Sequence, residues 1–294
     1  MKSFKIYKKQ IPEELIDDFL ATHQKFKNNK LSSFRAQGNT VFEKPILDKF
    51  DHQINSIHNP HLLIWNGLNK KTLKILHHEN IINCLHDFYD CKEDIVHYQS
   101  MFFDKSTATS LHQDTWYLDT KPKGRLVGVW IALEDIDNSS GPFYVIDKTD
   151  SKPVSFDDYD FNDIDNDHQF RMDYPNAKKI KFLAKKGDIL IWNSLLFHGA
   201  FRPEIESLTR KSLTSHFYLA KEKLQDPPVK RFMSIYDHLK PITTSHRELK
   251  LATTISPHFY SYICFAMRFL GNKSSSLIAK DNQHNKKISD IRNL

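Results

Sequence analysis

Residues 124–146 read GRLVGVWIALEDIDNSSGPFYVI and contain two short apolar runs separated by a polar turn. Both runs are rich in β-branched and aromatic residues, whereas Asp, Asn, Ser, Gly and Pro fill the interval between them. This pattern is typical of two neighbouring β-strands. No helix-period segment separates the runs in the manner of a βαβ unit, so the stretch predicts an all-β arrangement.

The same pattern of short apolar runs separated by turn residues extends in both directions, over residues 95–220. The further apolar runs are DIVHYQSMFFDK, KKIKFLAKKGDILIWNSLLFHG and RKSLTSHFYLA. Turns rich in Gly, Pro, Asn and Asp split them, and a regular succession of short strands predicts a sandwich or a barrel. The expected fold class is therefore mainly β with flanking helices (α+β).

Helical segments flank this core, and the simplest division is a single domain over 1–294. Residues 1–94 are expected to be mainly helical, with one helix opening at Pro12 and a second from about Lys70 to Tyr89. Residues 221–294 form a C-terminal helical extension whose most apolar part is HFYSYICFAMRFLGNK. Within the 95–220 core, residues 151–180 form an insert, and its acidic part, 157–173, predicts a long surface loop or lid.

Composition argues against several classes of protein. The 294 residues include only 8 glycines and no P-loop or G-x-G-x-x-G pattern, which argues against a nucleotide-binding fold. The net charge of +6 comes from scattered lysine pairs, typical of solvated faces rather than of a nucleic-acid surface. No apolar run is long enough for a transmembrane span, although the basic, aromatic C-terminal helix suits weak contact with a membrane surface. Three cysteines without a C-x-x-C pair indicate the cytoplasm.

Two patterns of the H-x-D or H-x-E type are candidates for metal binding, His112–Asp114 and His77–Glu79. In a helix, side chains two positions apart point roughly 200° apart and cannot hold one ion. In a strand, they emerge on the same face. Because His77–Glu79 falls in a predicted helix and His112–Asp114 in a predicted strand, only the second pair is geometrically suited.

A third ligand is expected from His198, at the far end of the strand ILIWNSLLFHG. Two antiparallel strands would then meet at the mouth of one barrel. Two neutral imidazoles and one carboxylate on one face suit non-haem Fe(II) and leave coordination positions open. On the residues of the H-x-D pair alone, the alternative that His112 and His198 are ordinary strand histidines stays open.

Arg210 lies twelve residues after His198 and opens a strand expected to run beside the His198 strand. An arginine that points into a barrel needs an anionic partner, because a buried unpaired guanidinium is costly. A carboxylate matches its two parallel N–H donors best. Ser212, two residues further on the same face, would add a hydroxyl, whereas Arg202 beside Pro203 is expected to face solvent.

Together these features resemble the phytanoyl-CoA dioxygenase family of Fe(II)/2-oxoglutarate oxygenases. The resemblance rests on YQSMFFDK, LHQDTWYLDT, GRLVGVWIALEDIDNSSGPFYVI, GDILIWNSLLFHGA and RKSLTSHF, which occur in family order. It implies a double-stranded β-helix (jelly-roll, cupin-like) core and the cofactors Fe(II), 2-oxoglutarate and O2. It also implies hydroxylation of an unactivated C–H bond in a small or carrier-bound substrate, with 2-oxoglutarate converted to succinate and CO2.

The resemblance assigns roles to the candidate residues. His112, Asp114 and His198 would hold the iron, and Arg210 would pair with the distal carboxylate of 2-oxoglutarate. Family members that halogenate replace the metal-binding aspartate by a small residue. Because Asp114 is present, the resemblance implies a hydroxylase rather than a halogenase.

Further contacts to the co-substrate follow from the same resemblance. Trp130 occupies a position that shapes the 2-oxoglutarate pocket in the family. Gln99 is either a polar contact at the site or a strand glutamine that faces solvent. Ala200 departs from the family, in which a serine often stands at this position, and Ser212 would have to supply the missing hydroxyl.

Two other classes of function compete with this interpretation. One is a cupin-like metalloenzyme that does not use 2-oxoglutarate, against which Arg210 argues. The other is a non-enzymatic binding barrel that uses the basic, aromatic tail as its contact surface. Measurement of Fe(II) binding and of 2-oxoglutarate binding distinguishes the three classes: the oxygenase binds both, the cupin-like metalloenzyme binds only the metal, and the binding barrel binds neither.

Overall fold

A computed structural model of the chain describes residues 2–37, 42–63, 67–147, 152–155, 157–161, 163–225 and 242–243. The larger of its sheets has nine strands in the order β1-β10-β7-β12-β5-β4-β2-β3, with β14 pairing with β5. These strands are β1 (Phe4–Tyr7), β2 (Phe34–Arg35), β3 (Phe42–Glu43), β4 (Ile57–His58), β5 (Ile95–Phe103), β7 (Val127–Ala132), β10 (Ile189–Asn193), β12 (Ser212–Leu219) and β14 (Ile242–Thr243).

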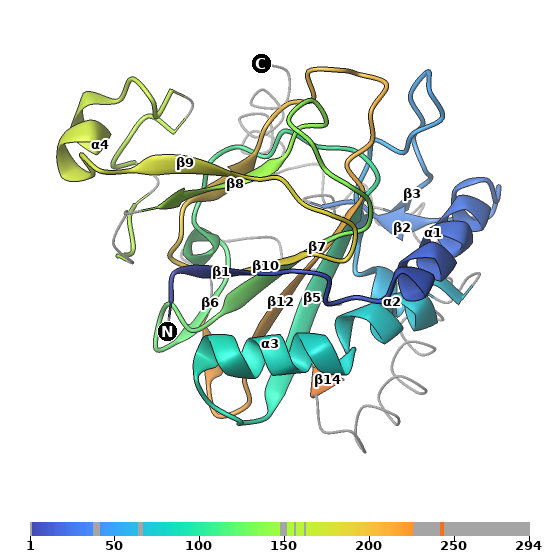
Figure 1. Cartoon of the computed structure of the whole chain (residues 1–294), viewed down its shortest axis with the longest axis horizontal. Helices are drawn as coiled ribbons and strands as arrows, with labels where there is room; N and C mark the ends of the chain where they lie inside the picture. Colours follow the sequence, from blue (N-terminus) through green and yellow to red (C-terminus); the bar gives the residue numbers. More distant parts are fainter. Residues whose placement is uncertain are drawn as a thin grey trace, which may run out of the picture.

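A smaller, three-stranded sheet packs against the larger one (Figure 1). Its order is β11-β8-β9, and a separate pair joins β13 to β6. The strands are β6 (Asp119–Lys121), β8 (Phe143–Asp147), β9 (Lys178–Phe182), β11 (His198–Ala200) and β13 (Lys223–Gln225). The helices are α1 (Glu13–Lys27), α2 (Leu68–Leu76), α3 (Glu79–Tyr89) and α4 (His168–Asp173), with 3-10 turns η1 (Pro60–Leu62) and η3 (Asp114–Trp116).

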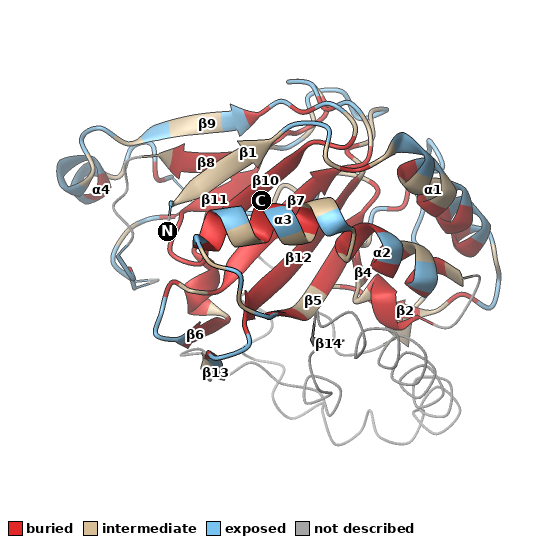
Figure 2. Ribbon diagram, turned by 60° about the horizontal axis from the view of Figure 1, so that its bottom comes forward, coloured by how far each residue is buried: buried red, intermediate tan, exposed pale blue. Residues whose placement is uncertain are grey.

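Alternation along the central strands creates two cores, one on each face of the larger sheet. Val127, Val129 and Ile131 of β7 pack into a core with residues of α1, α2 and α3, and Figure 2 shows α3 lying across this face. Trp130, between them in sequence, points to the opposite face, where it joins Phe143 of β8 in a second core. The predicted mainly β, jelly-roll type of core with flanking helices is confirmed.

The prediction of one helix from Lys70 to Tyr89 is wrong in one respect, because the segment forms two helices. α2 ends at Leu76 and α3 begins at Glu79. His78 has an extended backbone, and its side chain accepts a hydrogen bond from the backbone N–H of Asn80, as an N-cap residue does. His77 and His78 therefore connect the two helices, and Glu79 begins α3. The N-terminal region also supplies strands: β1 pairs with β10, and β4 pairs with β5.

The strand that was expected to run from residue 189 to His198 is also interrupted. β10 ends at Asn193, a turn follows, and His198 begins β11 in the smaller sheet. β12 does not run beside the His198 strand, since its neighbours are β5 and β7. Sequence alternation identified the strands, but it could not show that a short turn moves the chain from one sheet to the other.

The acidic 157–173 segment lies outside the two sheets and ends in α4 (Figure 1). The predicted C-terminal helical extension falls almost entirely outside the described residues, apart from β13 and β14. No helix among the described residues has the length and apolar character needed to cross a membrane.

Candidate active site

The two histidines of the candidate site lie side by side at one edge of the smaller sheet. His112 and His198 exchange both backbone hydrogen bonds at 3.0 Å, and their ring centroids are 4.2 Å apart. Nδ1 of His112 lies 2.8 Å from the carbonyl of Ser110, and Nδ1 of His198 lies 2.9 Å from that of Leu196. Because a carbonyl only accepts, each Nδ1 carries the proton and each Nε2 keeps its lone pair for a metal.

Asp114 completes the group. Its Oδ1 lies 3.8 Å from Nε2 of His112 and 3.5 Å from Nε2 of His198. Among the described residues these three are the group whose ligand atoms converge closely enough for one metal ion, all within 4.8 Å of one another. Asp114 starts η3 instead of continuing a strand, which corrects the prediction. The extended backbone of Gln113 nevertheless keeps His112 and Asp114 on the same side.

The electrostatics of the group favour the protonation states that a cationic metal requires. Burial lowers the pKa of His112 to about 4, an effect that neighbouring His198 strengthens and Asp114 opposes. Burial alone would raise the pKa of the Asp114 carboxyl, but the imidazoles of His198 and His216 together hold it well below its usual range. At neutral pH the group therefore offers a neutral His112 imidazole and an ionised carboxylate.

Arg210 lies two residues before β12, in the segment that leads into the larger sheet. It is 2% exposed, and its guanidinium lies over the rings of Phe103 and Trp130 at 5.5 and 5.6 Å. Burial lowers its pKa to about 10, against the opposing effect of Glu134, so the group remains a cation at neutral pH. Its Nη1 donates to the hydroxyl of Ser212 at 2.8 Å.

Two buried donors beside each other lack a hydrogen-bond partner among the described residues. They are Nε of Arg210 and Nε1 of Trp130. A buried donor without an acceptor is costly, and the cost is higher for a charged group. A ligand with an anionic acceptor would satisfy both, whereas exposed Arg202 makes no such demand.

The remaining candidate residues, Ser212, Gln99 and Ala200, differ in their burial and in their contacts. Ser212 is fully buried, and its oxygen accepts the bond from Arg210. Gln99 is half-buried and bonds to His216 instead of facing solvent; its Nε2 lies 3.2 Å from Nδ1 of that ring. Ala200 is buried in β11, opposite Phe143.

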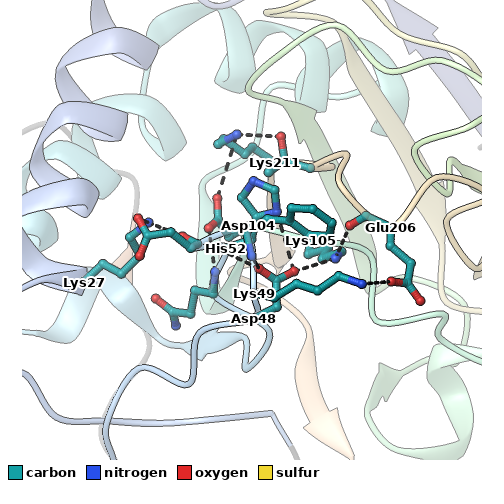
Figure 3. A network of polar contacts seen from close by, with 12 residues as sticks. Lys27, Asp48, Lys49, His52, Asp104, Lys105, Glu206 and Lys211 are labelled. Carbon is teal, nitrogen blue, oxygen red and sulfur yellow. Dashed lines mark hydrogen bonds and ion pairs between the residues drawn. The ribbon is translucent and has the colours of Figure 1, made fainter.

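A network of charged groups holds the chain segment that leads into β12 (Figure 3). The backbone N–H of Arg210 donates to the carbonyl of Asp104, and the Asp104 carboxylate accepts from the backbone of Gln53. Lys105 donates to Asp48 at 2.6 Å and also to the carbonyl of Glu206. The 48–53 turn, the end of β5 and the 206–210 segment are thus tied together, which fixes the backbone from which the Arg210 side chain extends.

The insert lies directly against the loop that carries His112 and Asp114. Gln113 donates to the carbonyls of Lys152 and Leu195 and accepts from the N–H of Val154. The indole of Trp116 donates to the carbonyl of Val154. Aromatic residues of the insert, Tyr159, Phe161, Phe170 and Tyr174, pack with Trp116 and Phe197.

Sequence reasoning missed two residues that contact Asp114, namely Trp192 and His216. Nε1 of Trp192 donates to Oδ2 at 2.9 Å, and Nε2 of His216 lies 3.3 Å from the same oxygen. A signal for His216 was present, since it follows Ser212 at an even spacing in β12 and so shares its face. No sequence signal pointed to Trp192, because its contact depends on how two sheets pack.

Two antiparallel sheets with a candidate His-Asp-His metal group at the β11 edge of the smaller one define a jelly-roll fold. The family model for phytanoyl-CoA dioxygenase (PhyH) matches residues 6–204, and the chain belongs to this family. The curated peroxisomal phytanoyl-CoA dioxygenases of Mus musculus and Bos taurus are 29% and 30% identical over 116 residues, 38% of this chain. The chain spans about a third of the length of these relatives, 34% in each case.

Solved structures share the fold at low sequence identity. The non-haem α-ketoglutarate-dependent carbocyclase SnoK matches with a TM-score of 0.55 and 15% identity, covering 82% of this chain and 87% of its own. The epimerase SnoN, solved with Fe3+, α-ketoglutarate and nogalamycin RO, matches with 0.55 and 12%, covering 77% and 83%. EctD from S. alaskensis, solved with 2-oxoglutarate and 5-hydroxyectoine, matches with 0.55 and 11%, covering 80% and 78%.

Proposed function

We propose that this protein is an Fe(II)/2-oxoglutarate-dependent oxygenase in which His112, Asp114 and His198 hold the iron. Three observations support the metal: convergent ligand atoms, Nε2 lone pairs that the Nδ1 hydrogen bonds leave free, and an ionised carboxylate. Membership of the PhyH family supports the same chemistry. Three protein ligands leave positions open for a co-substrate and oxygen.

The observation that carries the choice of 2-oxoglutarate is the unpartnered pair of donors on Arg210 and Trp130. Arg210 has no carboxylate within ion-pair distance among the described residues, yet it is buried and cationic. A dicarboxylate that reaches the metal with one end would place its other carboxylate here. A metalloenzyme without such a co-substrate would leave the guanidinium uncompensated.

In this mechanism the bound iron and 2-oxoglutarate supply the oxygen activation, and 2-oxoglutarate leaves as succinate and CO2. The chain's residues bind and orient. Arg210 pairs with the distal carboxylate, and the Ser212 hydroxyl holds the guanidinium in place. The Trp130 ring lies beneath the guanidinium and would offer its indole N–H.

The specific reaction that we propose is hydroxylation of an unactivated C–H bond in a small or carrier-bound substrate. Asp114 supports it, because a full set of three protein ligands leaves no extra position for a halide. The fold itself also serves an epimerase and a carbocyclase, so the product has to be identified directly. Incorporation of label from ¹⁸O2 into the product would support hydroxylation, and an unlabelled epimer or ring-closed product would contradict it.

We further propose that the 151–180 insert acts as a lid that excludes water during the reaction. Its described residues pack on Trp116 and Phe197, which lie beside the ligand residues in sequence. Exclusion of water protects a reactive centre from side reactions. The cytoplasm remains our proposal for the location, on the basis of the free thiols of Cys84 and Cys91.

The test of the proposed function is substrate-independent turnover of 2-oxoglutarate to succinate by the Fe(II)-loaded protein. Wild-type protein should form succinate slowly, and substrate should stimulate it. His198→Ala should abolish the reaction, since only two protein ligands remain. Succinate formation at the same rate by His198→Ala would contradict the assignment.

A further inference from the structure

The two oxygens of Asp114 have different neighbours. Oδ1 faces the Nε2 atoms of His112 and His198. Oδ2 faces away from them, toward Nε1 of Trp192 at 2.9 Å and Nε2 of His216 at 3.3 Å. The carboxylate is buried, 4% exposed, so solvent does not compete for Oδ2. One oxygen is thus left for a metal, and the other is held by the larger sheet.

We infer that Trp192 and His216 are positioning residues that hold Oδ2 of Asp114 so that the carboxylate binds the metal through Oδ1 alone. This inference rests on the proposed metal site. A carboxylate free to rotate can bind through both oxygens and occupy one further coordination position. Donors on Oδ2 prevent this and keep that position open for co-substrate or oxygen.

Trp192 reaches Asp114 because Gly128 leaves room for its ring. The two residues are register partners in β10 and β7. A Cβ added at Gly128 would lie 2.2 Å from Cζ2 of Trp192, far inside van der Waals contact. The indole is 1% exposed and has no free space into which it could withdraw. The missing side chain at 128 is therefore what permits the hydrogen bond to Oδ2.

His216 is oriented by a chain of polar groups that continues away from the metal site. Its Nδ1 lies 3.2 Å from Nε2 of Gln99, and Oε1 of Gln99 lies 3.5 Å from Nε2 of His58. An amide N–H only donates, so Nδ1 of His216 accepts and its Nε2 carries the proton. Nε2 is buried and has no hydrogen bond of good geometry among the described residues, which leaves the Asp114 contact as its partner.

Gly128 lies between these two donors. It pairs with Trp192 on β10 and with His216 on β12, so the three residues form one row across the larger sheet. The two rings approach edge to face, with centroids 6.4 Å apart. One row of residues across three strands therefore presents the Trp192 N–H as a hydrogen-bond donor, and Nε2 of His216 as a close electrostatic contact, to Oδ2. Since Asp114 belongs to the loop of the smaller sheet, this row also links the two sheets at the metal site.

Anaerobic titration of the protein with Co(II) tests the inference, with the metal affinity and the visible d–d spectrum as readouts. Trp192→Phe keeps the ring over Gly128 but removes the N–H, and it should weaken Co(II) binding roughly 10- to 100-fold. The spectrum should also shift, because carboxylate coordination changes. Tyr7→Phe is the control: it removes a hydrogen-bond donor from a ring on the opposite face of the larger sheet, where the hydroxyl donates to the carbonyl of Cys84, so Co(II) affinity should stay at the wild-type value.

A pair of His216 variants separates positioning from packing. His216→Gln retains an N–H donor at the far end of the side chain and should keep Co(II) affinity near the wild-type value. His216→Leu fills similar space without a donor and should weaken it. Equal affinities and spectra for wild type, Trp192→Phe and His216→Leu would overturn the inference while leaving the metal site intact. Wild-type protein that binds no Co(II) would contradict the metal site itself.

Discussion

The described part of the chain includes two clusters of imidazoles, one on each side of the larger sheet, and they differ in the partners of their ring nitrogens. The site cluster, His112, His198 and His216, surrounds the carboxylate of Asp114. The second cluster, His61, His77 and His97, packs between η1, the end of α2 and β5. Within it, Nε2 of His77 and Nδ1 of His97 bond to each other at 3.0 Å, and Nδ1 of His61 bonds to the Ser100 hydroxyl.

This difference indicates what would suit a cluster of histidines to bind a metal. In the site cluster, backbone carbonyls take the Nδ1 protons and leave Nε2 atoms directed at one point. In the second cluster, His77 and His97 bond to each other and His61 bonds to Ser100, so the rings do not converge on one point; burial lowers the pKa of His61 and His97 well below the usual value. Neutral imidazoles can fill a core, and they suit a metal ion only where their free lone pairs converge on one point, which an adjacent carboxylate such as Asp114 favours further.

Removal of Asp114 should have the largest effect. Asp114→Ala leaves two neutral ligands and no compensating charge, so Fe(II) binding and succinate formation should fall to background. His61→Phe, in the second cluster, should retain both. Measurement of bound iron and of succinate checks the pair. Loss of iron from His61→Phe as well as from Asp114→Ala would contradict the distinction drawn between the two clusters.

Acidification should destabilise the fold through the second cluster. Burial lowers the pKa of His77 to about 4, below the ~6.5 of an unfolded chain. The unfolded chain therefore binds protons first as pH falls, so this contribution to stability is complete above ~6.5 and is lost as pH approaches 4. For a shift of this size the loss is roughly 3 kcal/mol.

Chemical unfolding between pH 7 and 4 measures this effect. His77→Gln keeps a side chain that can donate to His97 but cannot titrate, so the free energy of unfolding should depend less steeply on pH. His168→Gln, at an exposed position of α4, is the control and should match wild type. An unchanged pH dependence in His77→Gln would show that the second cluster does not set acid stability.

Loss of the buried guanidinium should weaken binding of the co-substrate. Hydrogen bonds to charged groups contribute about 1.5–3 kcal/mol, so Arg210→Met should raise the KM for 2-oxoglutarate roughly 10- to 100-fold. Exposed Arg202→Met should leave it unchanged. Steady-state kinetics with varied 2-oxoglutarate measures both. Equal KM values in the two variants would favour a metalloenzyme that does not use 2-oxoglutarate.

The smallest effect is expected from the link between the ligand loop and the insert. Gln113→Leu removes three hydrogen bonds, including those to Lys152 and Val154, and should cost about 1–3 kcal/mol. Hydrogen exchange over 152–155 should accelerate. Gln169→Leu, whose amide bonds only within α4, should not change it. Equal exchange in the two variants would mean that Gln113 does not hold the insert.

The strands of the core could be predicted because alternation and turn residues are local signals. The same signals placed His112, Asp114, His198 and Arg210 on strands or strand ends, and the structure brings the first three together. Sheet membership could not be predicted: the turn after Asn193 moves His198 into the smaller sheet, and no local pattern encodes that change.

Contacts that depend on how the sheets pack also could not be predicted from the sequence. The contact between Trp192 and Asp114 requires two sheets at a set distance and a glycine opposite the ring. The break between α2 and α3 was missed because Ile75, Leu76 and Ile81 continue an apolar pattern across His77 and His78. The cap of α3 is formed by His78, whereas Ser, Thr, Asp and Asn are the usual N-cap residues.

Anaerobic titration of the protein with Fe(II) and then 2-oxoglutarate tests the central claim most directly. Chelation of the metal by 2-oxoglutarate should produce a weak visible metal-to-ligand charge-transfer band that saturates at one equivalent and is absent from His198→Ala. Fully metallated wild-type protein that shows no such band would contradict the account.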